Sequence, residues 1–395
     1  MLTQIRIQRY KSLYDTTVDL EPLTVFIGPN GSGKSNLLRF LELISVSAQG
    51  RLGKYIQSLG GMAPIVWDGQ TATIIFSLKC EASGRDLLTQ KSILVYDMEL
   101  ARVGQGSYYR LQKEVLTHAT GIGQGSPSVH ILRTGLKGNF LGNGPELISV
   151  RDDLQLEINE EESLLSTRIM GMSLLTQKME LFLRNWKVYH DVDVSQTASL
   201  RQAALARPER LVDADGQNLI QVLHTHYNEN RDFKNDINEA MRAAFGSDFE
   251  ELLFPPAADN RIQMRVRWKS LKREQSAADL SDGTLRFLLL LTVLTNPWST
   301  GLIAIDEPEN GLHPSMLPII AEYAVEASKR TQVIFTTHSP QFLDAFTDTK
   351  PTTTIAQWRE GETILKNVQG ELLDYWLQEY SLGALFRSGE LEAME

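Results

Sequence analysis

Alternating apolar and polar residues predict several strands in the first half of the chain. Residues 3–8 place Ile5 and Ile7 on one face, as expected of a half-buried strand. From about residue 71 the period of two returns. Turns rich in Gly, Ser and Asn divide it into further predicted strands at 72–79, 92–100, 108–113 and 154–158. The glycine- and serine-rich stretch 121–144 predicts a long exposed loop.

Helical spacing dominates the middle of the chain, from about residue 174 to 249. Apolar residues recur at intervals typical of one helix face at Leu174, Leu175, Met179, Phe182, Leu183 and Trp186. Residues 237–245 follow the same spacing, whereas 262–268 return to a strand pattern. A second α/β section runs from about 281 to 368. The sequence contains no heptad run long enough to predict a coiled-coil arm.

Residues 28–35 carry the most specific chemical signal of the chain. They read Gly28-Pro29-Asn30-Gly31-Ser32-Gly33-Lys34-Ser35 and fit the phosphate-loop pattern G-x-x-x-x-G-K-[ST]. Apolar residues precede the motif and a helical run follows it, so its backbone N–H groups would meet a helix N-terminus. Lys34 is expected to reach the β- and γ-phosphates, and the Ser35 hydroxyl to bind Mg²⁺. The alternative is a glycine-rich turn that matches by accident, which the flanking strand and helix disfavour.

Composition limits the partners. The 395 residues include 42% hydrophobic residues and carry a net charge of −10, so any contact with nucleic acid would need a local basic patch. The single cysteine, Cys80, excludes a disulfide within the chain and is expected to be buried. The N-terminus lacks a signal-peptide pattern, and the apolar run 287–294 is too short to span a bilayer. We therefore expect a cytoplasmic protein without membrane contact.

A second apolar strand, 302–305, ends in the acids Asp306 and Glu307. This is a Walker B pattern, in which the strand delivers Asp306 to a metal ion at its carboxyl end. Glu307 is the expected general base toward the attacking water. Pairs of acids are also common where a strand simply passes into a turn. The presence of a phosphate loop in the same chain favours the Walker B interpretation.

Two more motifs surround this strand. The apolar strand 333–337 ends in His338, and a parallel neighbouring strand would place this histidine beside Glu307 and the γ-phosphate. A structural histidine is the simpler alternative. Before Walker B, Ser281 precedes the apolar helix 285–294 and is the expected N-cap of a signature motif that binds an anion; an ordinary capped core helix is the alternative.

These motifs, in this order, resemble the ABC-class ATPases of the RecF, SMC and OLD branch. Asn30 is typical of that branch, and residues 9–13 (Arg-Tyr-Lys-Ser-Leu) resemble its N-terminal element, whose basic residue, here Lys11, lies near the nucleotide. The strings at 281–287 and 307–314 are similar to those of bacterial stand-alone RecF-like AAA family ATPases. So are Trp186, Tyr189, the string 215–219 and the tail 382–391.

The resemblance implies an α/β fold: an ABC-type, RecF/SMC head-like P-loop ATPase. It would have an N-terminal β-rich lobe and a helical lobe inserted between Walker A and Walker B. The corresponding parts are 1–165, 166–280 and 281–395.

The resemblance also implies ATP and Mg²⁺ as cofactors, with Glu307, His338 and Lys34 catalytic and with Ser35 and Asp306 at the metal. The implied nucleotide contacts are Gly28, Pro29, Asn30, Gly31, Ser32, Gly33, Lys34, Ser35, Asn36, Lys11, Ser281 and Gly283.

Some residues depart from the wider pattern. Asp282 stands where ABC transporters have glycine, and Thr284 where they have glutamine. Gln70 is only a weak candidate for the Q-loop. After the histidine strand about 55 residues follow, too few for the nuclease domain that ends OLD-type proteins, on the scale of roughly 100–200 residues per domain.

In this class, the signature of one subunit caps the ATP held by the phosphate loop of the other, so the resemblance implies a head-to-head homodimer around two ATPs. We expect a role in DNA repair or anti-phage defence, as sensor or regulator of a separate effector nuclease or toxin. The alternative is a recombination or repair ATPase that acts directly on DNA ends or gaps. Arg265, Arg267 and Lys269 would then track phosphates, unless nearby acids balance this strand face. A transporter subunit is disfavoured by the motif variants.

Overall fold

The computed structural model describes residues 1–82, 92–104, 107–120, 127–142, 144–298, 300–346, 349–368, 376–377 and 380–393. The chain forms two compact units. The first unit combines Met1–Trp186 with Thr352–Val368, and the second combines Lys187–Pro351 with Gln369–Glu395. The predicted division at 165 and 280 stays a prediction.

The first unit contains an eight-stranded antiparallel sheet in the order β2-β1-β4-β5-β6-β7-β8-β9. Its strands are β1 (Leu2–Tyr10), β2 (Leu13–Asp19), β4 (Thr73–Ala82), β5 (Ser92–Arg102), β6 (Tyr109–Thr120), β7 (Ser128–Thr134), β8 (Lys137–Leu141) and β9 (Leu147–Ser149). From Ser92 to Leu100 of β5, buried residues alternate with half-buried ones, which is the period of two that predicted this strand.

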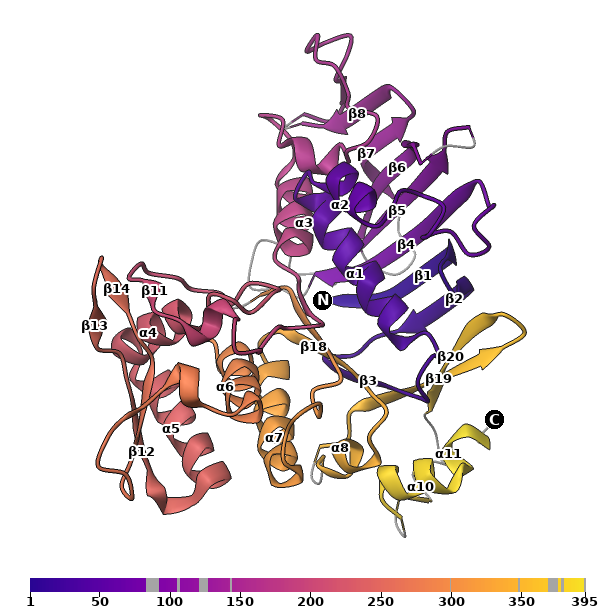
Figure 1. Ribbon diagram of the computed structural model, residues 1–395. Coiled ribbons are helices and arrows are strands. Elements are labelled where there is room, and N and C mark those ends of the chain that lie inside the picture. The colour runs from indigo at the N-terminus through magenta and orange to yellow at the C-terminus, as the bar shows by residue number, and fades with distance from the viewer. Residues whose placement is uncertain are drawn as a thin grey trace. The chain divides into compact units, whose positions relative to one another are not determined.

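Three helices cover one face of this sheet: α1 (Lys34–Ala48), α2 (Leu52–Ser58) and α3 (Leu174–Arg184) (Figure 1). Phe40 of α1 packs edge-on against Tyr10 of β1 and Phe76 of β4, with ring centroids 5.6 and 5.2 Å apart. Burial of aromatic rings in such a cluster contributes about 1.5–3 kcal/mol per side chain. The helix that follows the phosphate loop is therefore fixed to the sheet.

The first unit also contains the strand that leads into the phosphate loop. β3 (Leu23–Ile27) is buried along its whole length and pairs in parallel with β19 (Thr352–Arg359), which forms an antiparallel hairpin with β20 (Glu362–Val368). A central strand buried on both faces reads as a continuous apolar run, which is the pattern that predicted it.

Two sequence predictions for this unit are wrong. Most of the predicted loop 121–144 forms the hairpin of β7 and β8, turned at Gly135 with φ 56°; residues 121–126 and 143 lie outside the described residues. The predicted strand 154–158 is irregular chain, in which Leu154 and Leu156 are exposed.

Two buried side chains hold the irregular chain that follows 154–158. Glu114 accepts hydrogen bonds from the backbone N–H groups of Leu164 and Leu165, at 2.6 and 2.9 Å. Arg133 donates to the carbonyl oxygens of Asn159 and Glu162. These two side chains therefore pair four backbone groups of 159–165 that a sheet ladder would otherwise pair.

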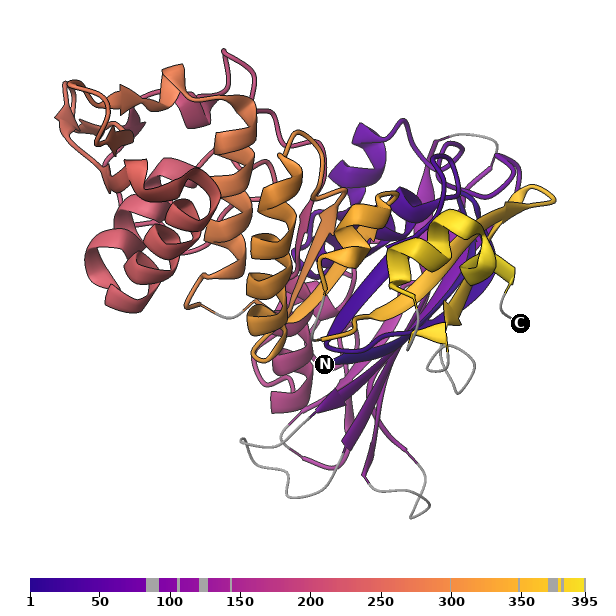
Figure 2. The ribbon, with the colours of Figure 1, turned by 90° about the horizontal axis from the view of Figure 1, so that it is seen from below.

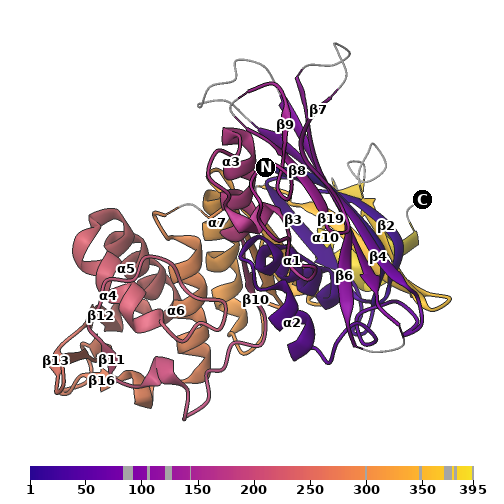
Figure 3. The same ribbon diagram turned by 90° about the horizontal axis from the view of Figure 1, so that it is seen from above.

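The second unit contains a parallel sheet in which β10 (Lys187–Tyr189), β17 (Leu302–Asp306) and β18 (Gln332–Thr337) are neighbours. Its helices are α4 (Leu219–Glu229), α5 (Arg231–Phe245), α6 (Asp282–Leu294), α7 (Leu317–Ser328), α8 (Pro340–Asp344), α10 (Leu382–Ser388) and α11 (Glu390–Ala393). Figure 3 shows α4, α5 and α6 gathered together, and Figure 2 shows α10 beside α8.

Short strands complete this unit in two small sheets. One contains β11 (Ala204–Leu205), β14 (Arg261–Ile262) and β13 (Pro256–Ala257), and the other β12 (Phe249–Leu253), β15 (Arg265–Trp268) and β16 (Gln275–Ser276). The predicted strand 262–268 is thus two strands in different sheets. The mixed α/β fold class is confirmed, and the predicted helical region 174–249 contains α3, α4 and α5.

Candidate nucleotide site

The phosphate loop joins β3 to α1, as its motif predicts, and its glycines are required by geometry. Gly31 and Gly33 have φ of 81° and 96°, a region that side chains rarely adopt. A Cβ at Gly33 would lie 1.9 Å from Thr363 Oγ1, and one at Gly28 would lie 2.2 Å from the Ala356 carbonyl oxygen. Neither position has room for a side chain, so the loop backbone is held close to the hairpin of β19 and β20.

The loop concentrates hydrogen-bond donors at the N-terminus of α1. Lys34 is 4% exposed, and its Nζ donates to the carbonyl oxygens of Gly28 and Pro29, at 2.8 and 3.0 Å. The Ser32 Oγ is buried and has no hydrogen-bond partner among the described residues. Ser35 is half-buried in the first turn of α1. An ammonium, an unpaired buried hydroxyl and a helix N-terminus together fit a phosphate chain.

A polar junction that the sequence analysis missed supports the loop. The Ser12 Oγ accepts hydrogen bonds from Asn36 Nδ2 at 2.8 Å and from Thr363 Oγ1 at 2.7 Å. Thr363 Oγ1 also lies 2.9 Å from the Ser32 carbonyl oxygen. The side-chain amide of Asn36, a predicted nucleotide contact, is therefore hydrogen-bonded to Ser12.

Two further predicted positions lie in turns. Lys11 connects β1 to β2 with φ 48°, and its backbone N–H donates to the Ile65 carbonyl oxygen at 2.8 Å. Burial, and then repulsion from Arg39, lower the pKa of the Lys11 ammonium. Gln70 is exposed, and its backbone N–H donates to Asp68 Oδ1 at 2.9 Å. Nucleotide contacts of both residues stay predictions.

In the second unit, β17 and β18 run parallel in the register that sets Asp306 opposite Thr336. The Thr336 hydroxyl donates to Asp306 Oδ1 and so orients the carboxylate at the end of its strand. Ligands of parallel sheets bind at this carboxyl edge. The structure therefore places Asp306 where a Walker B acid is expected.

The predicted proximity of Glu307 and His338 is confirmed. His338 Nδ1 lies 3.0 Å from Glu307 Oε1, and Asn310 Nδ2 donates to Glu307 Oε2 at 2.7 Å. An ionised carboxylate only accepts hydrogen bonds, so this contact assigns the Nδ1 proton to His338. Glu307 has φ 46°, a costly backbone conformation of the kind that clusters at functional sites.

A second carboxylate, Glu309, faces the same histidine and was missed by the sequence analysis. Its Oε1 accepts from the Thr337 hydroxyl and from the backbone N–H of His338 at 3.2 Å, and lies 3.7 Å from His338 Nδ1. Its side chain is 9% exposed, and burial raises its pKa. The Oε2 atom is buried without a partner in the described part of the chain.

The signature segment is capped as predicted. The Ser281 Oγ accepts from the Thr284 backbone N–H at 3.1 Å and begins α6. A Cβ at Gly283 would lie 2.5 Å from the Gly311 carbonyl oxygen. The loop after Walker B therefore packs directly against the first turn of the signature helix.

Arg201 explains the departure at Asp282. Its guanidinium bonds the Asp282 carboxylate and donates to the carbonyl oxygens of Leu280 and Val194, at 2.6 and 2.8 Å. The Arg201 side chain is 1% exposed, so its charge needs a compensating anion. A glycine in place of Asp282 would leave the guanidinium without this carboxylate.

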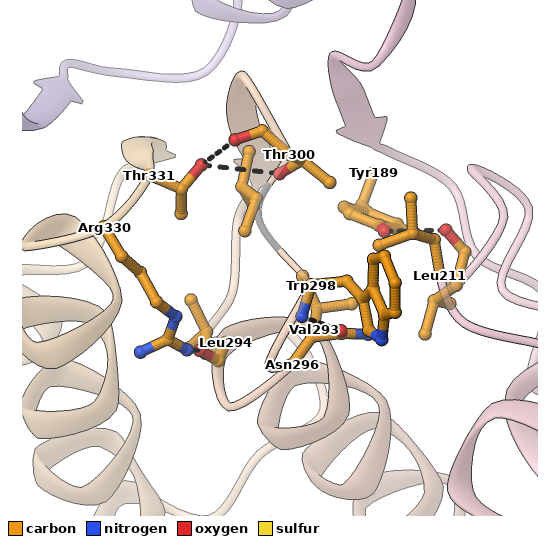
Figure 4. Close-up of a pocket in the computed structure, with 11 residues that line it drawn as sticks. Tyr189, Leu211, Val293, Leu294, Asn296, Trp298, Thr300, Arg330 and Thr331 are labelled. Atoms are coloured by element: carbon orange, nitrogen blue, oxygen red, sulfur yellow. Dashed lines mark hydrogen bonds between the residues drawn. The ribbon is translucent and has the colours of Figure 1, made fainter. Parts of the chain in front are cut away.

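A crevice lies at the opposite, amino-terminal edge of β17 and β18 (Figure 4). Its volume is about 10 Å³, far too small for a nucleotide. Its polar side chains bond within the protein: Thr331 with Thr300, and Tyr189 with the Val212 carbonyl oxygen at 2.9 Å. We therefore assign the crevice to packing.

The arginine row on β15 is paired with acids. Arg267 donates to Glu251 and Glu274, both at 2.7 Å, and Arg265 lies 3.8 Å from the Glu274 carboxylate. Of the two alternatives for this strand, these contacts match the one in which nearby acids balance the arginine charges.

Metal and membrane criteria add two observations on the described residues. These residues contain no group of three or more His, Cys, Asp or Glu side chains that could hold a metal ion by themselves. A Mg²⁺ site built from a serine hydroxyl, one carboxylate, phosphates and water would not form such a group. Nor does any helix of this part combine the length and apolarity of a membrane span.

Two family models match the chain. A model described as "AAA domain, putative AbiEii toxin, Type IV TA system" matches residues 177–344, and one described as "AAA ATPase domain" matches residues 1–87. An OLD nuclease of Thermus scotoductus is 22% identical over 350 residues, which are 87% of this chain. The alignment spans only 60% of that relative's length.

Solved structures share the fold. An SMC head bound to the C-terminal winged-helix domain of ScpA is 11% identical, with a TM-score of 0.53, covering 95% of this chain and 99% of that one. A second SMC head, with an extended coiled coil and bound to the C-terminal domain of ScpA derived from Pyrococcus furiosus, is also 11% identical. Its TM-score is 0.53, and 96% of this chain and 98% of that chain are covered.

Proposed function

We propose that the chain is an ATPase of the ABC, SMC and OLD type and that it hydrolyses ATP with Mg²⁺. The observation that carries the proposal is the Glu307–His338 pair beside Asp306, at the carboxyl edge of a parallel sheet. The glycine-lined loop with Lys34 supports it independently.

Each residue of the two motifs has a proposed role. Lys34 leaves the carbonyl oxygens of its own loop and neutralises the β- and γ-phosphates. Ser35 and Asp306 would hold Mg²⁺, which would supply positive charge against the phosphates. Glu307 accepts a proton from the attacking water, and His338, with its proton on Nδ1, keeps the carboxylate oriented.

We further propose an ATP-dependent homodimer in which the Ser281 segment of one copy completes the nucleotide site of the other. The capped α6 supports this, because the Ser281 hydroxyl and the first N–H groups of that helix suit an anion. Loss of the γ-phosphate would remove these contacts and loosen the dimer. ATP occupancy would thus set the oligomeric state.

The cellular role that we propose is regulation of a separate effector, a nuclease or toxin, in anti-phage defence or DNA repair. One matching family description names a toxin of a type IV toxin–antitoxin system, and the SMC heads were solved bound to ScpA domains. Direct action on DNA ends is less supported, because Glu251 and Glu274 neutralise the arginine row.

Glu307→Gln tests the catalytic assignment. The amide keeps the shape of the side chain but cannot accept the proton, so we expect ATP turnover to fall by about 10²-fold or more. ATP binding should persist and ATP-bound dimers should accumulate, as measured by phosphate release, equilibrium binding and light scattering. Glu250→Gln, an exposed acid of β12, is the matched control. Wild-type turnover in Glu307→Gln would remove Glu307 from the role of base.

A further inference from the structure

The environment of Glu309 differs from that of the other acids in its loop. Asp306 ends its strand and Glu307 is tied to His338 and Asn310, whereas Glu309 turns back beneath the end of β18. It is buried, yet no basic side chain other than His338 forms an ion pair with it among the described residues. A buried carboxylate without a strong cation is costly, so a structural role alone would favour a neutral side chain.

The contacts of Glu309 all lead to the histidine. One oxygen accepts from the backbone N–H of His338 and from the hydroxyl of the preceding Thr337. The Thr337 oxygen in turn accepts from the Ser339 backbone N–H at 2.9 Å. These bonds hold the main chain on both sides of His338, whose Nδ1 lies 3.0 Å from Glu307 Oε1.

The distances from the His338 ring to the two carboxylates also indicate a role for Glu309 at this histidine. His338 Nδ1 lies 3.0 Å from Glu307 and 3.7 Å from Glu309, so the ring edge faces two carboxylates. Both carboxylates therefore lie within 4.0 Å of the same ring nitrogen.

We propose that Glu309 is a positioning residue of the hydrolytic site, which holds the backbone of His338 so that its ring lies against Glu307. The inference rests on the proposed ATPase function and assigns Glu309 no contact with the nucleotide.

Two substitutions separate the parts of this role. Glu309→Gln keeps an oxygen for the two hydrogen bonds but removes the charge, and Glu309→Ala removes both. We expect kcat to fall by about 10–100-fold in Glu309→Ala, as for other residues that orient catalytic groups, with KM for ATP near the wild-type value. Glu309→Gln should give a kcat between those of wild type and Glu309→Ala, because its amide keeps one oxygen for the two hydrogen bonds.

A spectroscopic measurement keeps the test independent of turnover. In protein labelled with ¹⁵N-histidine, with His338 assigned by comparison with His338→Gln, the wild-type ring should show a proton on Nδ1. Glu309→Ala should lose this single tautomer, and Thr337→Val should weaken it. Glu322→Gln, an exposed acid of α7, is the control and should change neither kinetics nor spectrum.

The two proposals fail separately. If the wild-type chain does not hydrolyse ATP, the proposed function fails, while the His338 spectrum still reports on Glu309. If Glu309→Ala leaves the spectrum and kcat unchanged, the positioning role is overturned even in an active ATPase.

Discussion

Single side chains decide how the signature segment is held. Arg201 is buried and donates hydrogen bonds to backbone carbonyl oxygens of the segment that leads into α6. Its positive charge is paired with the carboxylate of Asp282. The aspartate at this position therefore has a structural cause within the same chain. Its hydrogen bond also lies at the N-terminus of α6, where a negative charge is favourable.

Asp282→Ala should destabilise the protein by roughly 1–2 kcal/mol, because a buried guanidinium loses its anion while the aspartate itself is largely exposed. Urea unfolding of Asp282→Ala, Arg201→Met and the double variant measures the coupling between the two side chains. A coupling free energy near zero would show that Asp282 acts only on the helix dipole.

Residue-level contacts were the least predictable from the sequence. The phosphate-loop residues, Asp306, Glu307 and His338 stand in local motifs that name them. Ser12 and Thr363 bond each other across 351 positions of sequence, and no local pattern announces such a pair. Glu309 stood within a string that resembles known ATPases, but its burial and its direction toward His338 are visible only in the fold.

At the scale of elements, strong periodicity was a sound guide and composition was not. The apolar runs of β3, β17 and β18 and the capped α6 lie where the pattern predicted them. Glycine and serine in 121–144 suggested a loop, but Gly135 supplies a tight turn and the flanking residues pair as β7 and β8. The 154–158 segment alternates like a strand, yet Arg133 and Glu114 bind the chain that follows it.

The start of α3 should respond to pH. His130 Nδ1 lies 2.7 Å from the Ser173 Oγ that caps this helix, and its ring is 5.8 Å from that of His118. Burial lowers the pKa of both rings below 6.5, and His118 lowers that of His130 further. The unfolded chain therefore binds more protons than the folded one as pH falls below 6.5.

Their contribution to stability is present above pH 6.5 and is lost as pH falls through the lowered pKa values. We expect the free energy of unfolding to decrease between pH 7 and pH 5, with a shallower slope in His118→Phe. His313→Asn, at an exposed position, is the control. Equal slopes in wild type and His118→Phe, measured by urea unfolding at each pH, would contradict this account.

At the scale of the whole molecule, the motifs divide between two compact units. The phosphate loop belongs to the first, and the signature, Asp306, Glu307 and His338 belong to the second. Two AAA-type family models match parts of this chain, and the ATPase activity, the dimer, the effector and the cellular role are proposals. Their common premise is that one chain supplies only part of each complete ATP site.

Mixing two inactive variants tests this premise most directly. Lys34→Ala lacks phosphate binding, and Ser281→Arg blocks the signature without touching its own phosphate loop. A dimer of one of each contains one intact composite site, so an equal mixture should regain about a quarter of wild-type ATP turnover if the copies pair at random. Each variant alone should stay inactive. Full activity of Ser281→Arg alone, or no recovery in the mixture, would contradict the shared site.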